Sequence, residues 1–163
     1  MRVSPLPIAP ILKERCVPLV IAGAFELFTA RMGEWWPLAT HSIGGTDVTG
    51  VRFEACVGGR VVEVHGDGTE HVWADVIAWD PPERFVLAWH PNLTPEAASI
   101  LEVRFREVAD GTDVNLEHRA WEEFGAQVGG VLRAGYDPGW DVVLAPFTGA
   151  AVTSPPLHGA CLP

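Results

Sequence analysis

The sequence predicts an α+β fold in which a curved antiparallel sheet of about six or seven strands lies against one long C-terminal helix. Two observations lead to this prediction. Apolar and polar residues alternate with a period of two through most of residues 51–120, and tight-turn signals separate the alternating segments. A helical apolar period then runs over residues 121–147. Consecutive hairpins require an antiparallel sheet, and one long amphipathic helix can cover one of its faces.

The first predicted elements are a strand and a helix. A loose alternation predicts a strand over residues 11–18, which ends at a proline. Apolar residues at helical spacing then predict one helix from residue 21 to Gly33. The Trp-Trp-Pro sequence at 35–37 predicts an aromatic corner, because a proline disfavours helical conformation at the residue before it.

The remaining strands are predicted to follow one another through hairpins. The turn signals are Gly58-Gly59, Gly66-Asp67-Gly68 and Asp110-Gly111, since glycine and aspartate favour the backbone conformations of tight turns. The expected strands cover residues 51–57, 60–65, 70–79, 84–90, 100–108 and 112–120.

The last predicted element is the longest helix. Glu122 and Glu123 suit its positive N-terminal end, and an apolar stripe follows. The stripe consists of Phe124, Val128, Val131, Leu132, Trp140, Val143 and Phe147. Pro138 predicts a bend near residues 136–139, because an interior proline removes a helix hydrogen bond.

Length and composition indicate one domain of ordinary composition. The 163 residues are divided into an N-terminal extension (1–10), a single domain (11–150) and a disordered C-terminal tail (151–163). Eleven basic and 21 acidic residues give a formal charge of −10, which disfavours nucleic acid and anionic lipid as partners. No export signal or membrane-inserting segment is recognised, so a cytoplasmic protein is expected.

Cysteines and histidines do not form a metal-binding pattern in the sequence. The three cysteines are widely spaced and are expected to be reduced core thiols. His65 and His71 flank a hairpin turn, but without a third ligand a solvated hairpin end is the favoured interpretation. No motif for a nucleotide or another cofactor is present, so no cofactor is expected.

An ordered series of short motifs runs along most of the chain. It comprises Leu27-Phe28-Thr29, Trp35-Trp36-Pro37, His41, Gly58-Gly59-Arg60, Glu63, Asp67-Gly68, Trp79-Asp80-Pro81-Pro82-Glu83-Arg84, Trp89, Gly111-Thr112, Leu116-Glu117-His118-Arg119 and Gly139-Trp140. Together, over roughly residues 11–148, they resemble the START-like (SRPBCC) superfamily. Within it, the sequence is similar to the branch named after the activator of Hsp90 ATPase.

This resemblance implies a helix-grip fold like that of the birch-pollen allergen, with a ligand cavity between the sheet and the last helix. It also implies a protein that binds a hydrophobic or aromatic small molecule. Related branches include polyketide cyclases, so a cyclase or dehydratase-like enzyme is an alternative. The sequence lacks the N-terminal chaperone-binding domain of the eukaryotic activator, which makes the second alternative, a chaperone-interacting protein, the weaker one.

The candidate ligand-binding residues are those expected to face the cavity or its rim. They are Trp36, His41, Glu63, Trp73, Trp89, His118, Trp121, Phe124, Val128, Leu132 and Tyr136. Indole rings suit flat aromatic ligands, although core packing is the commoner role of a buried tryptophan. For Trp73 the inward face of its strand stays open, because it alternates with Asp75 opposite Ala74 and Val76.

Glu63 and His118 are the candidates for chemistry. Both fall on inward phases of their strands, and a carboxylate and an imidazole in one apolar cavity could act as acid and base. Arg133 or Tyr136 could then orient a substrate carbonyl. The competing hypothesis is a structural hydrogen-bonded pair. In solution, a monomer or a weak homodimer is expected.

Overall fold

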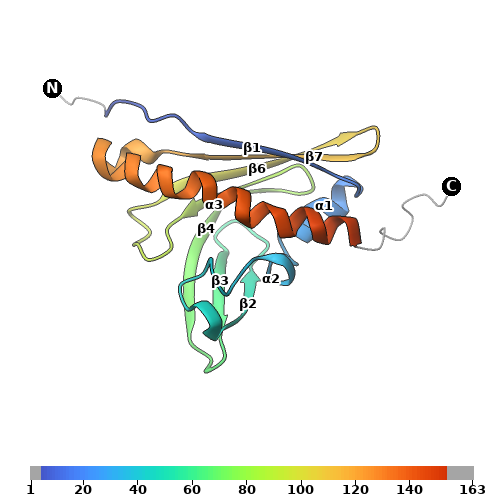
Figure 1. Ribbon diagram of the computed structural model, residues 1–163, viewed down its shortest axis with the longest axis horizontal. Helices are drawn as coiled ribbons and strands as arrows, with labels where there is room; N and C mark the ends of the chain where they lie inside the picture. Colours follow the sequence, from blue (N-terminus) through green and yellow to red (C-terminus); the bar gives the residue numbers. More distant parts are fainter. Residues whose placement is uncertain (1–4, 154–163) are drawn as a thin grey trace.

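The structure is a computed structural model, and it describes residues 5–153. Seven strands form one antiparallel sheet in the order β1-β7-β6-β5-β4-β3-β2. Their bounds are β1 Ile11–Val17, β2 Val48–Phe53, β3 Arg60–His65, β4 Glu70–Asp80, β5 Arg84–Trp89, β6 Ser99–Val108 and β7 Gly111–Arg119. The strands from β2 to β7 follow one another as antiparallel neighbours, while β1 closes the far edge beside β7, as Figure 1 shows.

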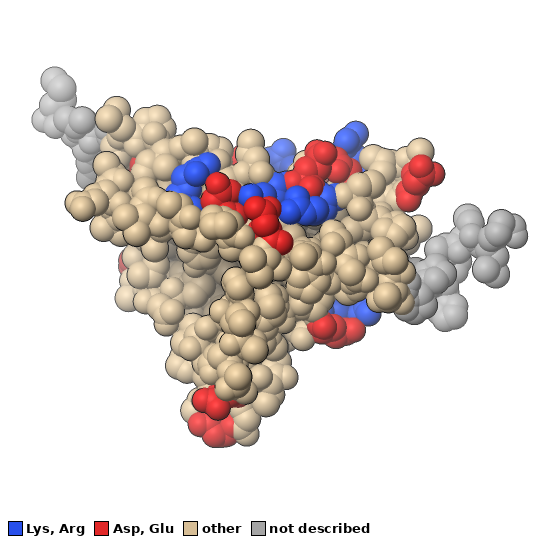
Figure 2. Space-filling model, in the orientation of Figure 1, with Lys and Arg blue, Asp and Glu red and all other residues tan. Residues whose placement is uncertain are grey.

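A 28-residue helix, α3 (Ala126–Thr153), crosses the curved sheet. One side of this helix buries Trp140, Val143, Leu144 and Phe147. On another side, Asp137 and Asp141 form ion pairs with basic residues of β1, and Figure 2 shows this charged band along the molecule. The sheet and helix together form the predicted helix-grip architecture, so the fold class is confirmed.

The proline at position 138 does not break α3. The helix is uninterrupted from Ala126 to Thr153, and Pro138 itself is exposed. Water can therefore reach the carbonyl group four residues earlier, whose helix hydrogen bond the proline removes. Of the tail expected over 151–163, residues 151–153 belong to α3 and the rest lies outside the described residues.

Several predicted elements have different bounds in the structure, most clearly the first helix and the strand after it. The helix expected over 21–33 is divided into α1 (Ile21–Phe28) and α2 (Met32–Trp35). The division occurs at Thr29, which leaves helical conformation while its hydroxyl donates to the carbonyl of Phe25. The strand expected over 51–57 ends at Phe53, and the residues after it form a turn.

The start of the last helix also differs from the prediction. Glu122 and Glu123 belong to a short 3₁₀ helix, η2 (Trp121–Phe124), and α3 begins after Gly125, whose φ is 85°. Val128 and Val131 are 54% and 69% exposed, so the apolar stripe predicted through them is wrong at these two positions. Cys16 and Cys56 are exposed rather than core thiols, while Cys161 lies outside the described residues.

The single core contains two groups of aromatic rings under α3, which Trp35 links. A phenylalanine cluster, made of Phe25, Phe28, Phe85, Phe105 and Phe147, has ring centroids 5.0–6.2 Å apart in successive contacts. A tryptophan cluster lies nearer the start of α3 and contains Trp36, Trp73, Trp89 and Trp140. Edge-to-face and tilted ring pairs of this kind add packing energy beyond the burial of their area. The tryptophan cluster leads to the candidate site.

Two segments outside the strands and long helices lie beside the sheet and α3. The chain from Pro37 to Gly44 connects α2 to a one-turn 3₁₀ helix, η1 (Gly45–Asp47). Residues 5–10 of the expected N-terminal extension have no regular secondary structure, and residues 1–4 lie outside the described part. Arg133 of α3 binds the backbone carbonyls of Ala9 and Pro10, which attaches this segment to the helix. Across the described residues, no helix is long and apolar enough to span a membrane.

Candidate functional site

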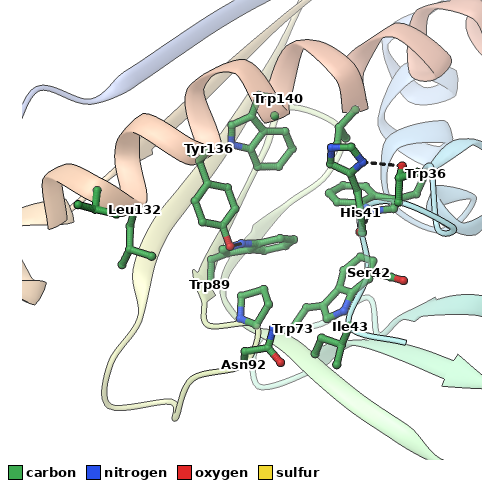
Figure 3. Close-up of a pocket in the computed structure, with 16 residues that line it drawn as sticks. Trp36, His41, Ser42, Ile43, Trp73, Trp89, Asn92, Leu132, Tyr136 and Trp140 are labelled. Carbon is green, nitrogen blue, oxygen red and sulfur yellow. Dashed lines mark hydrogen bonds between the residues drawn. The ribbon is translucent and has the colours of Figure 1, made fainter. Parts of the chain in front are cut away.

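A pocket of about 390 Å³ opens between α3, the segment 40–43 and the sheet (Figure 3). This volume lies within the range of about 300–1,000 Å³ that is usual for small-molecule sites. The residues lining it are Trp36, Thr40, His41, Ser42, Ile43, Trp73, Trp89, Pro91, Asn92, Val131, Leu132, Gly135, Tyr136, Gly139, Trp140 and Val143. The lining contains no Lys, Arg, Asp or Glu. It is therefore suited to a neutral ligand rather than to an ion.

Four indole rings form much of the pocket wall. Trp36 lies 5.0 Å from Trp73, 6.0 Å from Trp89 and 5.8 Å from Trp140, measured between ring centroids. All four rings are at least nine-tenths buried. We call Trp36, Trp73, Trp89 and Trp140 the indole wall.

Every N–H group of the indole wall donates to the protein itself. Trp36 Nε1 donates to the carbonyl of His41 at 2.7 Å, and Trp73 Nε1 donates to Glu63 Oε1 at 2.6 Å. Trp89 Nε1 donates to the Tyr136 hydroxyl at 3.1 Å, and Trp140 Nε1 donates to His118 Nδ1 at 3.0 Å. Because these donors are satisfied, the rings are held in place and offer the pocket their apolar surfaces.

A β-bulge determines the direction of Trp73. In the pairing of β3 with β4, Val61 faces Ala74 and Val62 faces Val72, so Trp73 is the extra residue of the bulge. A bulge can re-aim a side chain without changing the strand around it. Trp73 is consequently 2% exposed on the pocket side, although Ala74, beside it, is also buried. This resolves the question of which face Trp73 occupies.

Glu63 holds the pocket wall from behind. Its Oε1 accepts from the backbone N–H of Ile43 and from Trp73, and its Oε2 accepts from the N–H of Gly44 and lies 2.6 Å from His65 Nε2. Burial raises the pKa of the Glu63 carboxyl, but the donated hydrogen bonds outweigh burial and keep this pKa below its ordinary value. Glu63 is therefore ionised and joins the segment before η1 to the indole wall.

His118 is a second buried polar residue behind the wall. Its Nδ1 accepts from Trp140, so Nε2 carries the proton and donates to Ser99 Oγ at 2.7 Å. Burial lowers the pKa of His118 from 6.5 to about 3. A neutral imidazole with both nitrogens bonded is a structural group that fixes the orientation of Trp140.

The predicted pairing of Glu63 with His118 is wrong. Each binds different partners, and neither lines the pocket. The two strands carrying them are separated by β4, β5 and β6 in the sheet, which sequence alternation alone does not reveal. The hairpin end is exposed from Gly66 to His71, as predicted, whereas His65 is partly buried because its ring contacts Glu63 and lies 4.8 Å from His71. No group of three or more metal-ligating side chains occurs in the described part of the chain.

The other predicted ligand-binding residues separate into two groups. Trp36, His41, Trp73, Trp89, Leu132 and Tyr136 line the pocket. Trp121 is buried behind His118, Phe124 packs partly against the core, and Val128 points to solvent, so these three are outside the pocket. Arg133 is also outside, since it binds the N-terminal segment.

Several lining residues were missed by sequence reasoning. Ile43 and Asn92 come from segments without periodicity, and Gly139 follows the proline where a bend was expected. Trp140 was placed on the apolar stripe of the last helix but not among the candidate ligand-binding residues. For Asn92 a signal existed, because an asparagine after a proline is a turn residue that tolerates the positive φ of 60° it adopts here. Helical spacing from the candidate Tyr136 would have added Trp140 to the ligand-binding list.

The curved sheet and the long helix, with a pocket between them, define a helix-grip protein. Residues 22–150 match the family model described as "Activator of Hsp90 ATPase homolog 1-like protein". The chain belongs to this family, which confirms the resemblance seen in the sequence. No curated protein matches the chain.

Solved structures give the same fold. Protein MLL2253 from Mesorhizobium loti is 15% identical to this chain, with a TM-score of 0.64. The match covers 94% of this chain and 100% of the MLL2253 chain. The Aha1 dimer from Colwellia psychrerythraea is 16% identical with a TM-score of 0.62, covering 88% of this chain and 96% of its own. An anthrahydroquino-γ-pyrone synthase, Txn09, is 30% identical with a TM-score of 0.58, covering 88% of this chain and 97% of its own.

Proposed function

We propose that this protein binds a planar aromatic small molecule in the pocket between α3 and the sheet. The observation behind this proposal is the indole wall, whose four N–H groups are already bonded within the protein. Such a wall favours a ligand that stacks or makes edge contacts with aromatic rings. A neutral lining and a volume of about 390 Å³ are consistent with a ligand of two or three fused rings.

The similarity to Txn09 supports this class of ligand. That protein is a synthase of an anthrahydroquino-γ-pyrone, a fused aromatic compound, and its structure is of a complex. From 30% identity over most of both chains, we infer a related pocket chemistry.

Binding can be tested with fluorene and its fully saturated counterpart, perhydrofluorene. Fluorene is expected to quench the tryptophan fluorescence and to bind at least about tenfold more tightly, since aromatic contacts of about 0.5–1.5 kcal/mol each accumulate at the wall. Equal affinity for both compounds, or no binding of either, would contradict the proposal.

Two glycines of α3 provide a blocking variant and its matched control. A Cβ atom at Gly139 or at Gly130 would meet open space, but only Gly139 lines the pocket. Gly139→Leu is therefore expected to weaken fluorene binding about tenfold or more by occupying pocket volume, and Gly130→Leu is expected to leave it unchanged. A similar loss in both variants would mean that the binding site lies elsewhere.

A second candidate function is ring closure of a bound aromatic precursor, and the relationship to a γ-pyrone synthase favours it. In such a reaction a phenol oxygen adds to the distal carbonyl carbon of a neighbouring 1,3-diketone, and the carbonyl oxygen then leaves as water. An o-hydroxyaryl 1,3-diketone is a suitable test compound, because the resulting chromone absorbs differently in the ultraviolet. Chromone formation that is no faster with protein than without it would eliminate this candidate.

A chaperone-interacting role is a further alternative, and it rests on the name of the family alone. Recovery of the protein with an Hsp90-type chaperone in a pull-down would favour it.

A further inference from the structure

Tyr136 is held rigidly on the wall of the pocket. Its ring lies 5.0 Å from His118 and 5.5 Å from Trp121, measured between centroids, and its hydroxyl accepts the N–H of Trp89 at 3.1 Å. Figure 3 shows the ring extending from α3 into the space that His41 borders on the opposite side. The position of the hydroxyl is thus determined by three neighbours before any ligand arrives.

The hydrogen bond from Trp89 also determines which hydrogen bonds the Tyr136 hydroxyl can still form. The indole N–H can only donate, so the tyrosine oxygen acts as acceptor and its own proton remains available. Within the described residues, that proton has no bonded acceptor. Burial raises the pKa of Tyr136, with the Trp89 hydrogen bond opposing this effect, so the hydroxyl keeps its proton at neutral pH.

Two other hydroxyl groups around the pocket already have partners within the protein, and Asn92 is exposed to water. The Ser42 hydroxyl donates to the carbonyl of Leu38 and accepts from the N–H of Gly45. The Thr40 hydroxyl contacts His41 Nδ1. Tyr136 is therefore a fixed donor directed at a largely apolar space, where a hydrogen bond is not weakened by competing water.

We infer that Tyr136 selects ligands that carry a neutral carbonyl or quinone oxygen, to which its hydroxyl donates a hydrogen bond. This inference rests on the proposed function, because it names the polar feature of the aromatic ligand bound there. The absence of Lys and Arg from the pocket lining favours a neutral acceptor over a carboxylate or phosphate.

The test compares 9-fluorenone with fluorene, which share one planar skeleton and differ by the carbonyl oxygen. Wild-type protein is expected to bind fluorenone about fivefold more tightly, which corresponds to about 1 kcal/mol. Tyr136→Phe is expected to remove this preference by weakening fluorenone alone. Leu132→Ala, a pocket variant on the preceding turn of α3, is expected to weaken both compounds by a similar factor.

Infrared difference spectroscopy supplies an independent measurement on the bound ketone. The C=O stretch of fluorenone is expected at lower wavenumber in the wild-type complex than in an apolar solvent, and this shift should be lost in Tyr136→Phe. An unshifted band in the wild-type complex would overturn the inference even if the variant failed to fold. Wild-type protein that bound both compounds without preference would overturn this inference alone, whereas binding of neither would overturn the proposed function.

Discussion

The neutral state of His118 links a single residue to the stability of the whole protein. Its folded-state pKa of about 3 lies below the ordinary value of 6.5, so the unfolded chain binds the proton more readily. The contribution of neutral His118 to the free energy of unfolding is fully present above about pH 6.5, and it is lost as the pH falls toward 3. Between about pH 7.5 and 5.5 the expected loss is about 1.4 kcal/mol of unfolding free energy.

The variant His118→Asn tests this prediction. The asparagine oxygen can still accept from Trp140, but the side chain cannot be protonated in this range. Urea unfolding at the two pH values should show that the variant lacks most of the wild-type pH dependence. The exposed His71 offers a control, because the variant His71→Asn should keep the pH dependence of the wild-type protein. An unchanged pH dependence in His118→Asn would show that another group is responsible.

At the scale of an element, the segment 40–44 depends on Glu63 for its position. Ile43 and Gly44 donate their N–H groups to this one carboxylate, which also holds Trp73. The segment forms one side of the pocket, while the indole wall and α3 form the others. A loop without secondary structure thereby becomes part of a defined binding surface.

Glu63→Gln should loosen this segment. An amide NH₂ group would face at least one of the N–H donors, and the resulting loss of unfolding free energy is expected to be about 2–4 kcal/mol. Hydrogen exchange at Ile43 and Gly44 should increase, and fluorene affinity should decrease. Glu70→Gln makes the same chemical change at an exposed ion pair with Arg52 and should have little effect, because such pairs contribute little. Equal effects of the two changes would contradict the proposed role of Glu63.

Helix α3 shows how position within an element limits the effect of a proline. Pro138 lies on the solvent side, between two residues that face the pocket, Tyr136 and Trp140. The missing hydrogen bond is therefore placed where water can compensate for it. The ion pairs of Lys13 with Asp137 and Asp141 hold the same part of the helix against β1.

For the whole molecule, we predict a monomer or a weak homodimer. The formal charge of −10 makes copies repel one another at low ionic strength. The edge strand β1 carries alternating charges at Lys13, Glu14 and Arg15, which discourages pairing with another edge. Sedimentation velocity at about 10 µM protein should show mainly monomer in low salt and a larger dimer fraction in high salt. A dimer that persists at about 0.1 µM would contradict this prediction.

Much of the fold followed from local patterns in the sequence. The period-two alternation, the glycine turns and the final helical period were sufficient to predict the antiparallel sheet and the helix across it. They succeeded because each signal is local, such as the turn at Gly58-Gly59 between β2 and β3. Element ends were less accurate where one side chain altered the backbone, as at Thr29.

The candidate site was predictable only in part. The supply of tryptophans and the helical spacing of Leu132 and Tyr136 indicated an aromatic pocket under α3. The direction of Trp73 depended on a bulge, which shifts the alternation by one residue and has no signature in a single sequence.

The amino-acid sequence by itself determined the order of the elements, the family and the aromatic character of the cavity. Tertiary structure decided which polar groups form hydrogen bonds to the residues that line this cavity. Glu63 is bound by amides 19 and 20 residues earlier, and His118 by an indole 22 residues later. Hydrogen bonds between distant segments depend on how the sheet curves and where the helix crosses it, and no local period encodes those positions.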